Sequence, residues 1–196
     1  MMTDKESKSI SRFLSLILRH RPEKAGITLD AHGWAEVDAL IDGMNNVRHM
    51  AVTFDDVKHV VATNDKQRFS FNDDCTKIRA NQGHSVPVDV ELKEAQPPPV
   101  LYHGTSADSL QSIEADGIIT RNRLHVHLSG DVDTAFKVGK RHGRPTVLSI
   151  DTARMTEDGF VFYISANGVW LTKHVPAAYV RQLSQKDIAR ARSESS

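Results

Sequence analysis

Cationic side chains that could bind a phosphate gather where the first apolar helix of the sequence ends. The stretch Leu18-Arg19-His20-Arg21-Pro22 closes a run with apolar residues at positions 10, 13, 14, 17 and 18, a spacing that predicts an amphipathic helix. Because proline does not continue a helix, Arg19 and His20 fall in its last turn. Cations there also complement the helix dipole. Taken alone, the cluster fits either a phosphate site or a purely structural role.

Two further cationic positions lie elsewhere in the chain. Arg68 opens a predicted hairpin, and a basic run from Lys140 to Arg144 follows a predicted helix. Gly143 marks a tight loop in that run, and such a loop can present a guanidinium to a phosphate through two parallel hydrogen bonds. The alternatives are a surface arginine at a strand end and a solvated basic face.

Three short stretches have the composition of a small-molecule site. In His103-Gly104-Thr105-Ser106, predicted as a turn from a strand into a helix, the glycine would let the backbone approach a ligand and the helix N-terminus would face an anion. The alternative is an ordinary capped turn. His125 and His127 share one face of a predicted strand, and Ser129 follows them. Asn167-Gly168-Val169 is typical of a turn that leads into a strand.

Composition narrows the class of protein. The 196 residues carry a formal net charge of zero, so a polyanion site must be built from local clusters. The single cysteine, Cys75, excludes a disulfide framework within the chain and a multi-cysteine zinc site. The ten histidines show no metal-ligand spacing. The N-terminal stretch is charged and lacks a hydrophobic signal region, and no later stretch could span a bilayer. The sequence therefore predicts a soluble cytoplasmic protein. We expect a monomer with no metal and no membrane partner.

Residues 1–90 predict a helical unit that ends in a hairpin. A helix is expected at about 5–20, with Thr3 and Glu6 as a capping box. A short extended piece at 33–35 and two more helices follow, and a hairpin closes the unit. Three helices followed by a hairpin are a winged-helix arrangement, which contacts nucleic acid or protein. The later pieces are helices at 36–45 and 53–63, the second capped by Thr53, and strands at 68–71 and 76–79 joined by a turn at 72–74.

Residues 91–99 predict a linker, since three consecutive prolines favour an extended chain. Residues 100–185 then alternate short strands with helices, and 186–196 are expected to be a flexible tail. The fold class predicted for the whole chain is α+β. The expected strands are 100–102, 125–128 and 146–150, with extended pieces at 160–164 and 169–172, and the expected helices are 107–116 and 132–140.

Eight stretches of the sequence, spread over about residues 9–181, occur in the order and spacing seen in RNA 2'-phosphotransferases of the KptA type. The chain therefore resembles that family over nearly its whole length. The stretches are Leu18-Arg19-His20-Arg21-Pro22, Gly33-Trp34, Lys66-Gln67-Arg68-Phe69, Arg79-Ala80-Asn81-Gln82-Gly83-His84-Ser85, Tyr102-His103-Gly104-Thr105, Val126-His127-Leu128-Ser129, Val138-Gly139-Lys140-Arg141-His142-Gly143 and Asn167-Gly168-Val169-Trp170-Leu171-Thr172.

The resemblance implies an NAD-dependent transferase that acts on an internal 2'-phosphate of RNA, as in spliced tRNA. It implies an N-terminal winged-helix lobe that binds RNA and a C-terminal lobe that resembles ADP-ribosyltransferases and binds NAD. In the family's chemistry the RNA phosphate attacks the nicotinamide ribose at C1'' and nicotinamide leaves. The ribose 2''-hydroxyl then attacks the phosphate, which releases RNA with a 2'-hydroxyl and ADP-ribose 1'',2''-cyclic phosphate.

The resemblance also implies residue roles. Arg19, His20, Arg68 and Arg141 match the family's catalytic set, in which the arginines bind the 2'-phosphate and the histidine binds phosphate in the second step. Arg141 is preferred to Arg144 because it occupies the arginine of the family's Gly-x-Arg-His-Gly pattern. Since the set comes from both sides of the linker, we expect the active cleft where the two lobes meet.

The NAD-binding residues follow from the same resemblance. His103, Gly104 and Thr105 match the first motif of the ADP-ribosyltransferase-like fold, and His127 matches the second, with Ser129 beside it. The third motif falls at Asn167-Gly168-Val169, where many protein-modifying members carry a glutamate. A phosphate nucleophile has less need of a carboxylate, which agrees with the apolar valine.

Two other functions remain open from the sequence. One keeps the NAD chemistry but modifies a phosphorylated nucleic-acid end or a protein, and it predicts a stable ADP-ribosylated product. The other is a non-catalytic nucleic-acid-binding module that uses the winged helix. That module would bind without NAD and would tolerate loss of His20 and Arg68.

Overall fold

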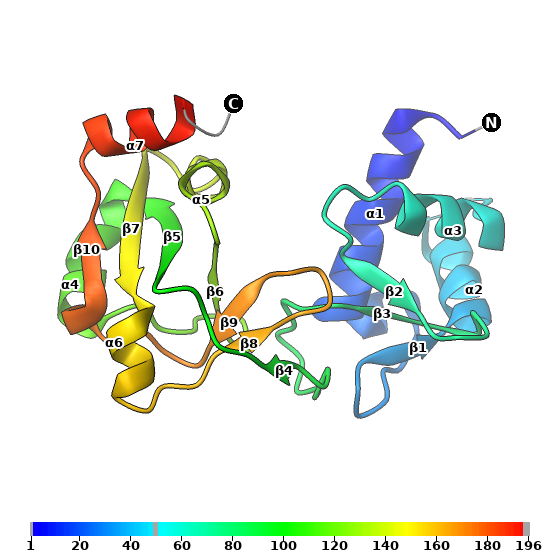
Figure 1. The fold of residues 1–196 in the computed structure, drawn as a ribbon. Helices are drawn as coiled ribbons and strands as arrows, with labels where there is room; N and C mark the ends of the chain where they lie inside the picture. Colours follow the sequence, from blue (N-terminus) through cyan, green and yellow to red (C-terminus); the bar gives the residue numbers. More distant parts are fainter. Residues whose placement is uncertain (1, 49–50, 194–196) are drawn as a thin grey trace. The chain divides into compact units, whose positions relative to one another are not determined.

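A computed structural model describes residues 2–48 and 51–193 of the chain. The chain divides into two compact units, one up to Glu91 and one from Leu92 on (Figure 1). The described residues form α-helices and three small antiparallel sheets, which confirms the α+β class. No helix within 2–48 and 51–193 has the length and apolar character needed to cross a bilayer.

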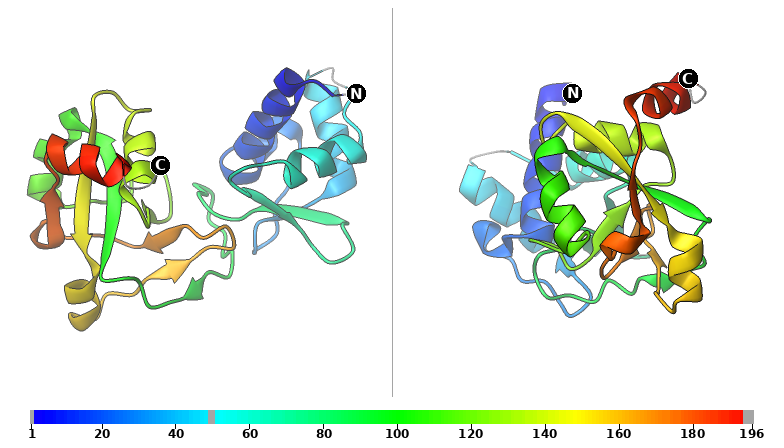
Figure 2. Two further views of the ribbon diagram at one scale, coloured as in Figure 1. Left: turned by 45° about the horizontal axis from the view of Figure 1, so that its top comes forward. Right: turned by 90° about the vertical axis from the view of Figure 1, so that its left-hand side faces the viewer.

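The first unit packs three helices against a three-stranded sheet of order β1-β3-β2 (Figures 1 and 2). Its core is formed by the apolar face of the first helix, including Leu14, Ile17 and Leu18, together with Leu40 and Ile78, all essentially buried. The predicted three helices and hairpin are confirmed. The elements are α1 (Asp4–Arg19), the 3-10 turn η1 (Pro22–Ala25), β1 (Trp34–Glu36), α2 (Val37–Arg48), α3 (Phe54–Ala62), β2 (Phe69–Phe71) and β3 (Lys77–Ala80).

Both predicted helix caps are present. Thr3 Oγ1 accepts a hydrogen bond from the Glu6 N–H at 3.3 Å, and the Thr3 N–H donates to the Glu6 carboxylate at 2.7 Å. Thr53 and Asp56 form the same reciprocal pair at the start of α3. These hydrogen bonds satisfy backbone donors that no helical carbonyl reaches, so α1 and α3 begin where the sequence predicts.

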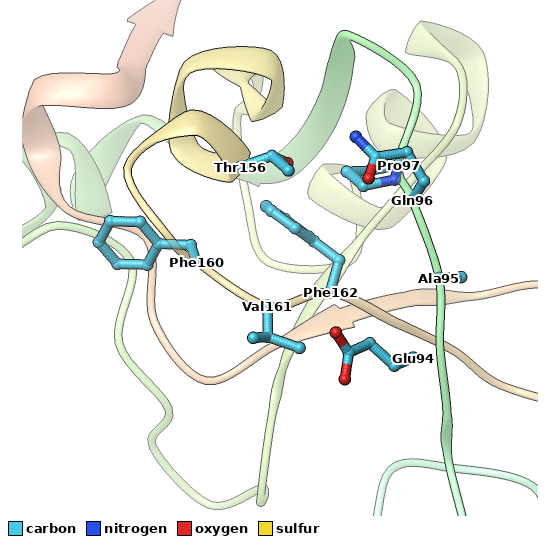
Figure 3. Close-up of a pocket in the computed structure, with 8 residues that line it drawn as sticks. All are labelled: Glu94, Ala95, Gln96, Pro97, Thr156, Phe160, Val161 and Phe162. Atoms are coloured by element: carbon cyan, nitrogen blue, oxygen red, sulfur yellow. The ribbon is translucent and has the colours of Figure 1, made fainter.

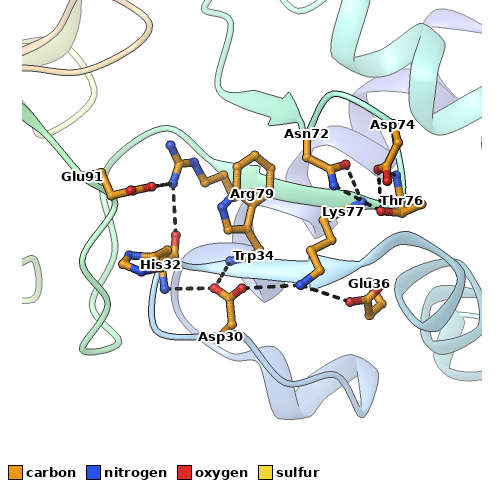
Figure 4. Close-up of polar contacts among 10 residues, drawn as sticks. All are labelled: Asp30, His32, Trp34, Glu36, Asn72, Asp74, Thr76, Lys77, Arg79 and Glu91. Carbon is orange, nitrogen blue, oxygen red and sulfur yellow. Dashed lines mark hydrogen bonds and ion pairs between the residues drawn. The ribbon is translucent and has the colours of Figure 1, made fainter.

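The hairpin and its neighbouring strand are held by polar contacts (Figure 4). At the predicted turn, Asn72 Oδ1 accepts from the Lys77 N–H at 2.8 Å and Asp74 Oδ1 from the Thr76 N–H at 3.0 Å. Across the sheet the Arg79 guanidinium lies 4.4 Å from the centre of the Trp34 ring. These contacts fix β3 between β1 and β2, and the residues after β3 are therefore held close to α1.

The second unit contains a sheet of order β10-β7-β5 and a sheet of order β4-β8-β9-β6. A pair of backbone hydrogen bonds between Tyr102 and Ser129, at 2.9 and 2.7 Å, joins the two sheets. The elements are β4 (Lys93–Glu94), β5 (Val100–Ser106), η2 (Ala107–Ser109), α4 (Leu110–Asp116), β6 (Val126–Leu128), α5 (Val132–Gly139), β7 (Pro145–Asp151), α6 (Thr152–Glu157), β8 (Tyr163–Ile164), β9 (Trp170–Thr172), η3 (Ala177–Tyr179), β10 (Val180–Gln182) and α7 (Gln185–Ser193).

The stretch His103–Ser106 is not the predicted turn into a helix. It continues β5, which pairs with β7 from Val100 opposite Asp151 to Ser106 opposite Pro145. The expected strand 100–102 is therefore too short, because the partner strand is long enough to extend the pairing through Ser106. The helix α4 begins later, after the 3-10 turn η2.

Gly104 has a packing role that the sequence did not reveal. A Cβ atom at this position would lie 1.7 Å from the Ala135 carbonyl oxygen and 2.9 Å from the Gly139 nitrogen, both in α5. A Cβ at Gly139 would in turn lie 2.7 Å from the Thr105 oxygen. The two glycines let α5 pack on β5 backbone to backbone. This contact, within the unit itself, requires the glycine at 104.

The last described residues also differ from expectation. The sequence predicts a flexible tail at 186–196, but Gln185–Ser193 form α7, and residues 194–196 of that tail lie outside the described residues. Ile188 is buried against the unit, and Arg192 Nε donates to Asp133 Oδ1 at 2.8 Å. Ile188 and the ion pair of Arg192 with Asp133 thus help to dock a helix whose own sequence is mostly polar.

The extended and proline-rich pieces also take part in the fold. Of the predicted extended piece 160–164, only Tyr163–Ile164 form a strand. Within the predicted linker 91–99, Lys93–Glu94 pair with that strand as β4. The Pro99 carbonyl accepts from the Ala153 N–H at 3.0 Å. Most of this stretch is therefore part of the second unit.

Candidate functional site

Arg19 and His20 lie at the C-terminal end of α1, as predicted. The His20 N–H donates to the Leu16 carbonyl at 3.0 Å and closes the helix. Arg19 is only 8% exposed, whereas His20 is half-buried. A buried guanidinium is costly unless its surroundings compensate its charge or hold it for a ligand. The burial of Arg19 therefore marks it off from an ordinary surface arginine at a helix end.

Arg68 immediately precedes β2, and the backbone there is fixed by one buried residue, Asn81. Asn81 is 6% exposed; its N–H donates to the Arg68 carbonyl at 2.8 Å and its Nδ2 to the Gln67 carbonyl at 2.6 Å. Ser70 Oγ donates to Asn81 Oδ1 at 2.7 Å. Gln67 has a φ of 42°, a conformation that a non-glycine residue holds only when its neighbours enforce it. The backbone at Arg68 is therefore held in a defined conformation, which fixes the point from which the Arg68 side chain projects.

The segment 81–85, just after β3, connects Arg68 to the end of α1. A Cβ at Gly83 would lie 3.6 Å from the Arg19 guanidinium carbon, so the segment passes beside this cation. The Ser85 N–H donates to the Arg19 carbonyl at 2.9 Å, and Ser85 Oγ lies 2.9 Å from His20 Nδ1. The structure thus brings the three predicted catalytic residues of the first unit to one segment, for which the sequence analysis gave no role.

His84, inside this segment, is a neutral imidazole. It is 2% exposed, and burial, together with the charges of Arg19 and His20, lowers its pKa to about 4. The ring is hydrogen-bonded to the Leu18 backbone, and its Nε2 has no hydrogen-bond partner among the described residues. Nδ1 therefore carries the proton and donates it to the Leu18 carbonyl. A neutral ring at this position adds no positive charge beside Arg19.

His103 and His127, in the second unit, are in contact. His103 Nδ1 lies 3.0 Å from the His127 carbonyl oxygen, and His127 Nδ1 lies 3.0 Å from the His125 carbonyl oxygen. Because a carbonyl only accepts hydrogen bonds, both rings carry their proton on Nδ1. Burial lowers the pKa of His103, which keeps that ring neutral at pH 7. Its Nε2 lone pair is therefore suited to accept a hydrogen bond from a hydroxyl group, such as that of a ribose.

The strand register places Ser129 and the turn 167–169 at one end of β6, whereas Gly104 and Thr105 lie in β5. Ser129 follows β6 and pairs with Tyr102, the neighbour of His103. Leu128 lies opposite Trp170, so the turn before Trp170 is at the same end. In that turn Ser165 Oγ accepts from the Val169 N–H at 3.0 Å and lies 2.8 Å from Asn167 Oδ1. The turn Asn167-Gly168-Val169 is thus held by one buried serine.

Arg141 lies in the tight turn after α5, where its N–H donates to the Val138 carbonyl at 3.1 Å. Arg141, His142 and Arg144 are exposed. Partial burial and the charge of Arg141 lower the pKa of Arg123, which places the two guanidinium groups in one electrostatic environment. The charge of His142 likewise contributes to the lowered pKa of His103. Arg123 was not singled out from the sequence, because an arginine in a polar loop carries no local signal.

A cavity of about 310 Å³ lies elsewhere in the second unit (Figure 3). Phe160 and Phe162 line it together with residues 94–97 of the predicted linker. None of the residues predicted to bind phosphate or NAD lines this cavity. Among the described residues, no group of three or more histidine, cysteine, aspartate or glutamate side chains is placed to hold a metal ion.

The two units therefore present different chemistry. The first holds Arg19, His20 and Arg68 around one segment, as an anion such as phosphate requires. The second holds His103 as a neutral acceptor with Ser129 and the turn at 167–169 close by, as a ligand rich in hydroxyl groups requires. Arg123 and Arg141 add positive charge in the second unit.

Comparison with known proteins identifies the group to which this sequence is related. The family model described as "RNA 2'-phosphotransferase, Tpt1 / KptA family" matches residues 5–174. A protein of Streptomyces coelicolor named "Probable RNA 2'-phosphotransferase" is 51% identical over 180 residues, 92% of this chain and 97% of that protein. Proteins of the same name from Acaryochloris marina and Burkholderia pseudomallei are 50% identical over 176 residues and 52% identical over 171 residues. These alignments cover 90% and 87% of this chain, and 97% and 92% of the relatives. The chain belongs to the RNA 2'-phosphotransferase, Tpt1 / KptA family.

Proposed function

We propose that this protein transfers an internal 2'-phosphate of RNA to NAD, giving RNA with a 2'-hydroxyl, nicotinamide and ADP-ribose 1'',2''-cyclic phosphate. The observation that carries the proposal is the convergence of Arg19, His20 and Arg68 on one segment in a chain of this family. A tRNA-like RNA that retains a 2'-phosphate after splicing is the substrate class. The first unit, with three helices and a hairpin, acts as a winged-helix RNA-binding lobe. The second acts as the ADP-ribosyltransferase-like lobe.

The arginines supply what the phosphate chemistry needs. A phosphate dianion is already a competent nucleophile toward a cationic sugar, so it must be positioned rather than deprotonated. In the second step charge develops on the oxygens of the transferred phosphoryl group, and preorganised cations stabilise that charge. Arg19 and Arg68 bind the 2'-phosphate, with His20 contacting phosphate in the second step. Arg141 is the fourth member of the set, and Arg123, whose pKa the charge of Arg141 lowers, shares the role of neutralising charge.

The second unit binds NAD through neutral groups. His103 accepts from a ribose hydroxyl through Nε2, since its Nδ1–H donates to the His127 carbonyl. Thr105 and Ser129 add hydroxyl groups, and the turn at 167–169 offers backbone amides. Gly104 supports the site indirectly, because it lets α5 pack behind β5. The fixed tautomer of His103 is the feature of this chain that suits it to a sugar hydroxyl.

The test is to incubate the purified protein with a short RNA that bears one internal 2'-phosphate, with and without NAD. A matched RNA of the same sequence with a 5'-phosphate and no 2'-phosphate is the control. Loss of the 2'-phosphate only with NAD, together with formation of ADP-ribose 1'',2''-cyclic phosphate, is the expected result. A stable ADP-ribosylated 5'-phosphate RNA would favour the ADP-ribosyltransferase alternative. RNA binding without any NAD-dependent product would favour the binding module.

A further inference from the structure

We propose that Ser85 is the positioning residue of His20: its hydroxyl group orients the imidazole and keeps a proton on Nε2, the ring nitrogen that contacts the phosphate. The inference rests on the proposed function, because it concerns how His20 acts in that reaction. Nothing in the spacing of the sequence connects these residues, which are 65 positions apart. The contact exists because segment 81–85 returns to the end of α1.

The backbone around Ser85 holds its hydroxyl group beside the His20 ring. Ser85 Oγ lies 2.9 Å from His20 Nδ1, an ordinary hydrogen-bond distance. The Ser85 backbone is itself anchored, since its N–H donates to the Arg19 carbonyl at 2.9 Å. The next residue, Val86, also donates its N–H to that carbonyl, at 3.4 Å. The hydroxyl is therefore held by the same backbone that presents Arg19 and His20, so its position is set relative to both.

The Ser85 hydroxyl has a single proton and two acceptors within reach. These are His20 Nδ1 at 2.9 Å and the Arg19 carbonyl oxygen at 3.5 Å. When the His20 ring is neutral, the shorter contact is the better hydrogen bond, so Ser85 donates to Nδ1. A neutral ring that accepts at Nδ1 carries its proton on Nε2. Nε2–H then donates to a phosphate oxygen.

Ser85 can also form a hydrogen bond with a cationic His20 ring. A protonated His20 donates from Nδ1, and Ser85 Oγ can accept this hydrogen bond while its own proton turns to the Arg19 carbonyl oxygen. Nε2–H is unchanged by the switch. Ser85 thus serves both protonation states of His20 with the ring in one orientation. An alanine at 85 would leave the neutral ring without the contact that selects its tautomer and its rotation.

The position of Ser85 favours this role over a structural one. Ser85 is exposed, whereas the neighbouring Gly83 and His84 are buried. An exposed hydroxyl contributes little to the core, and its removal leaves no cavity. The effect of a Ser85 substitution should therefore appear in the reaction and not in the stability of the fold.

The experiment measures kcat and KM of the phosphate transfer for Ser85→Ala at pH 8 and pH 5.5, always relative to the unaltered protein at the same pH. Ser85→Ala should lower kcat about 10–100-fold at pH 8, as loss of a group that orients an active side chain typically does. The loss should become smaller as the pH is lowered to 5.5, because a cationic ring donates from both nitrogens with or without Ser85. KM for NAD should not change.

Two variants control the result. Ser85→Thr retains the hydroxyl and should restore most of kcat at pH 8. Ser9→Ala removes an exposed serine on the same helix as His20 and should match the unaltered protein. A loss of equal size at both pH values, or one that threonine does not rescue, would overturn the proposal. Inactivity of the unaltered protein itself would instead contradict the proposed function.

A direct measurement on the unaltered protein gives an independent test. Nitrogen-15 NMR of the His20 ring at pH 8 should show Nε2 protonated and Nδ1 as the acceptor, and in Ser85→Ala the two tautomers should mix. The opposite tautomer in the unaltered protein would refute the assignment of the Ser85 proton. This result does not depend on the activity or on how well the variant folds.

Discussion

The two units hold their candidate side chains by different means. In the first, side-chain and backbone groups of one irregular segment reach Arg19, His20 and Arg68. In the second, His103 lies on a paired strand and its ring is fixed by the backbone carbonyl of a neighbouring strand. Cations that bind phosphate need to be held against mutual repulsion, whereas an acceptor for a hydroxyl needs only a fixed tautomer. Under the proposed function, the difference in support corresponds to a difference in ligand.

The imidazoles illustrate the same contrast. His84 lies beside Arg19 and is kept neutral by burial, so it fills space beside a cation without adding charge. His103 is also kept neutral by burial, but its Nδ1–H donates to the His127 carbonyl, so its Nε2 is suited to accept a hydrogen bond. Burial therefore limits the charge beside Arg19 in one unit and leaves an uncharged acceptor in the other.

Removal of a phosphate-binding cation should have the largest effect. Arg68→Ala should retain the fold and lower the rate of phosphate transfer by about 10²–10³, the usual cost of one preorganised donor. Arg68→Lys keeps the charge but not the planar guanidinium, so its rate should lie between those of Arg68→Ala and the unaltered protein. Single-turnover rates with saturating RNA and NAD measure the effect. Near-normal turnover of Arg68→Ala would remove Arg68 from the catalytic set.

Substitution of each arginine in the second unit tests which guanidinium contributes to the phosphate transfer. Arg141→Ala should lower the rate by about 10²–10³, and Arg123→Ala by about tenfold, as expected of a group that acts through its neighbour. The same single-turnover assay separates them. The reverse order would transfer the phosphate contact from Arg141 to Arg123.

Gly104→Ala should break the backbone contact that supports the second unit. Its Cβ would lie 1.7 Å from the Ala135 oxygen, so α5 must move away, and we expect a loss of about 3 kcal/mol in the free energy of unfolding. Gly130→Ala is the matched control, because a Cβ there meets nothing within 4 Å. Denaturant unfolding measures both. Equal stability of the two variants would contradict the packing role of Gly104.

His84 should make the stability of the protein depend on pH. Its pKa is about 4 in the folded protein against an ordinary 6.5, so only the unfolded chain takes up this proton between those values. Stability should be complete above pH 6.5 and should fall as the pH drops toward 4, by about 3 kcal/mol in total from this group. His84→Gln should flatten that slope in denaturant unfolding measured across the range. An unchanged slope would show that folding does not shift the pKa of this ring.

The smallest effect is expected at the turn of the second unit. Ser165→Ala removes the hydroxyl that accepts from the Val169 N–H and should raise KM for NAD about fivefold, since one hydrogen bond contributes about 1 kcal/mol. RNA affinity should stay the same. Isothermal titration with each substrate separates the two effects. A loss confined to RNA binding would contradict the division of ligands between the units.

Much of the fold could be predicted from local patterns. The periodicity of α1 and its capping box gave both ends of that helix correctly, and the alternating residues around Asn72 gave the hairpin. The course of β5 through His103–Ser106 was missed because its extent depends on β7, a strand about 40 positions later. Helix α7 was missed because its stability comes from Ile188 and Arg192 contacts with the rest of the unit.

Part of the candidate site could likewise be predicted from the sequence, and part could not. The types and spacing of Arg19, His20, Arg68 and the His103 motif are visible in the sequence. The influence of the Arg141 charge on the pKa of Arg123 and the position of Ser85 beside His20 are not. An arginine or a serine in a loop is too common to stand out, and only a neighbour that is distant in the chain gives it a role.

By itself the sequence determined the helices of the first unit, the residue types available for phosphate and NAD, and the resemblance to one family. These are properties of periodicity, capping and motif order, all of which are local. Only the tertiary structure decided why residue 104 is glycine, which nitrogen of His103 carries the proton, and that segment 81–85 contacts Arg19, His20 and Arg68. Each of these depends on contacts between residues far apart in the chain, which no local pattern encodes.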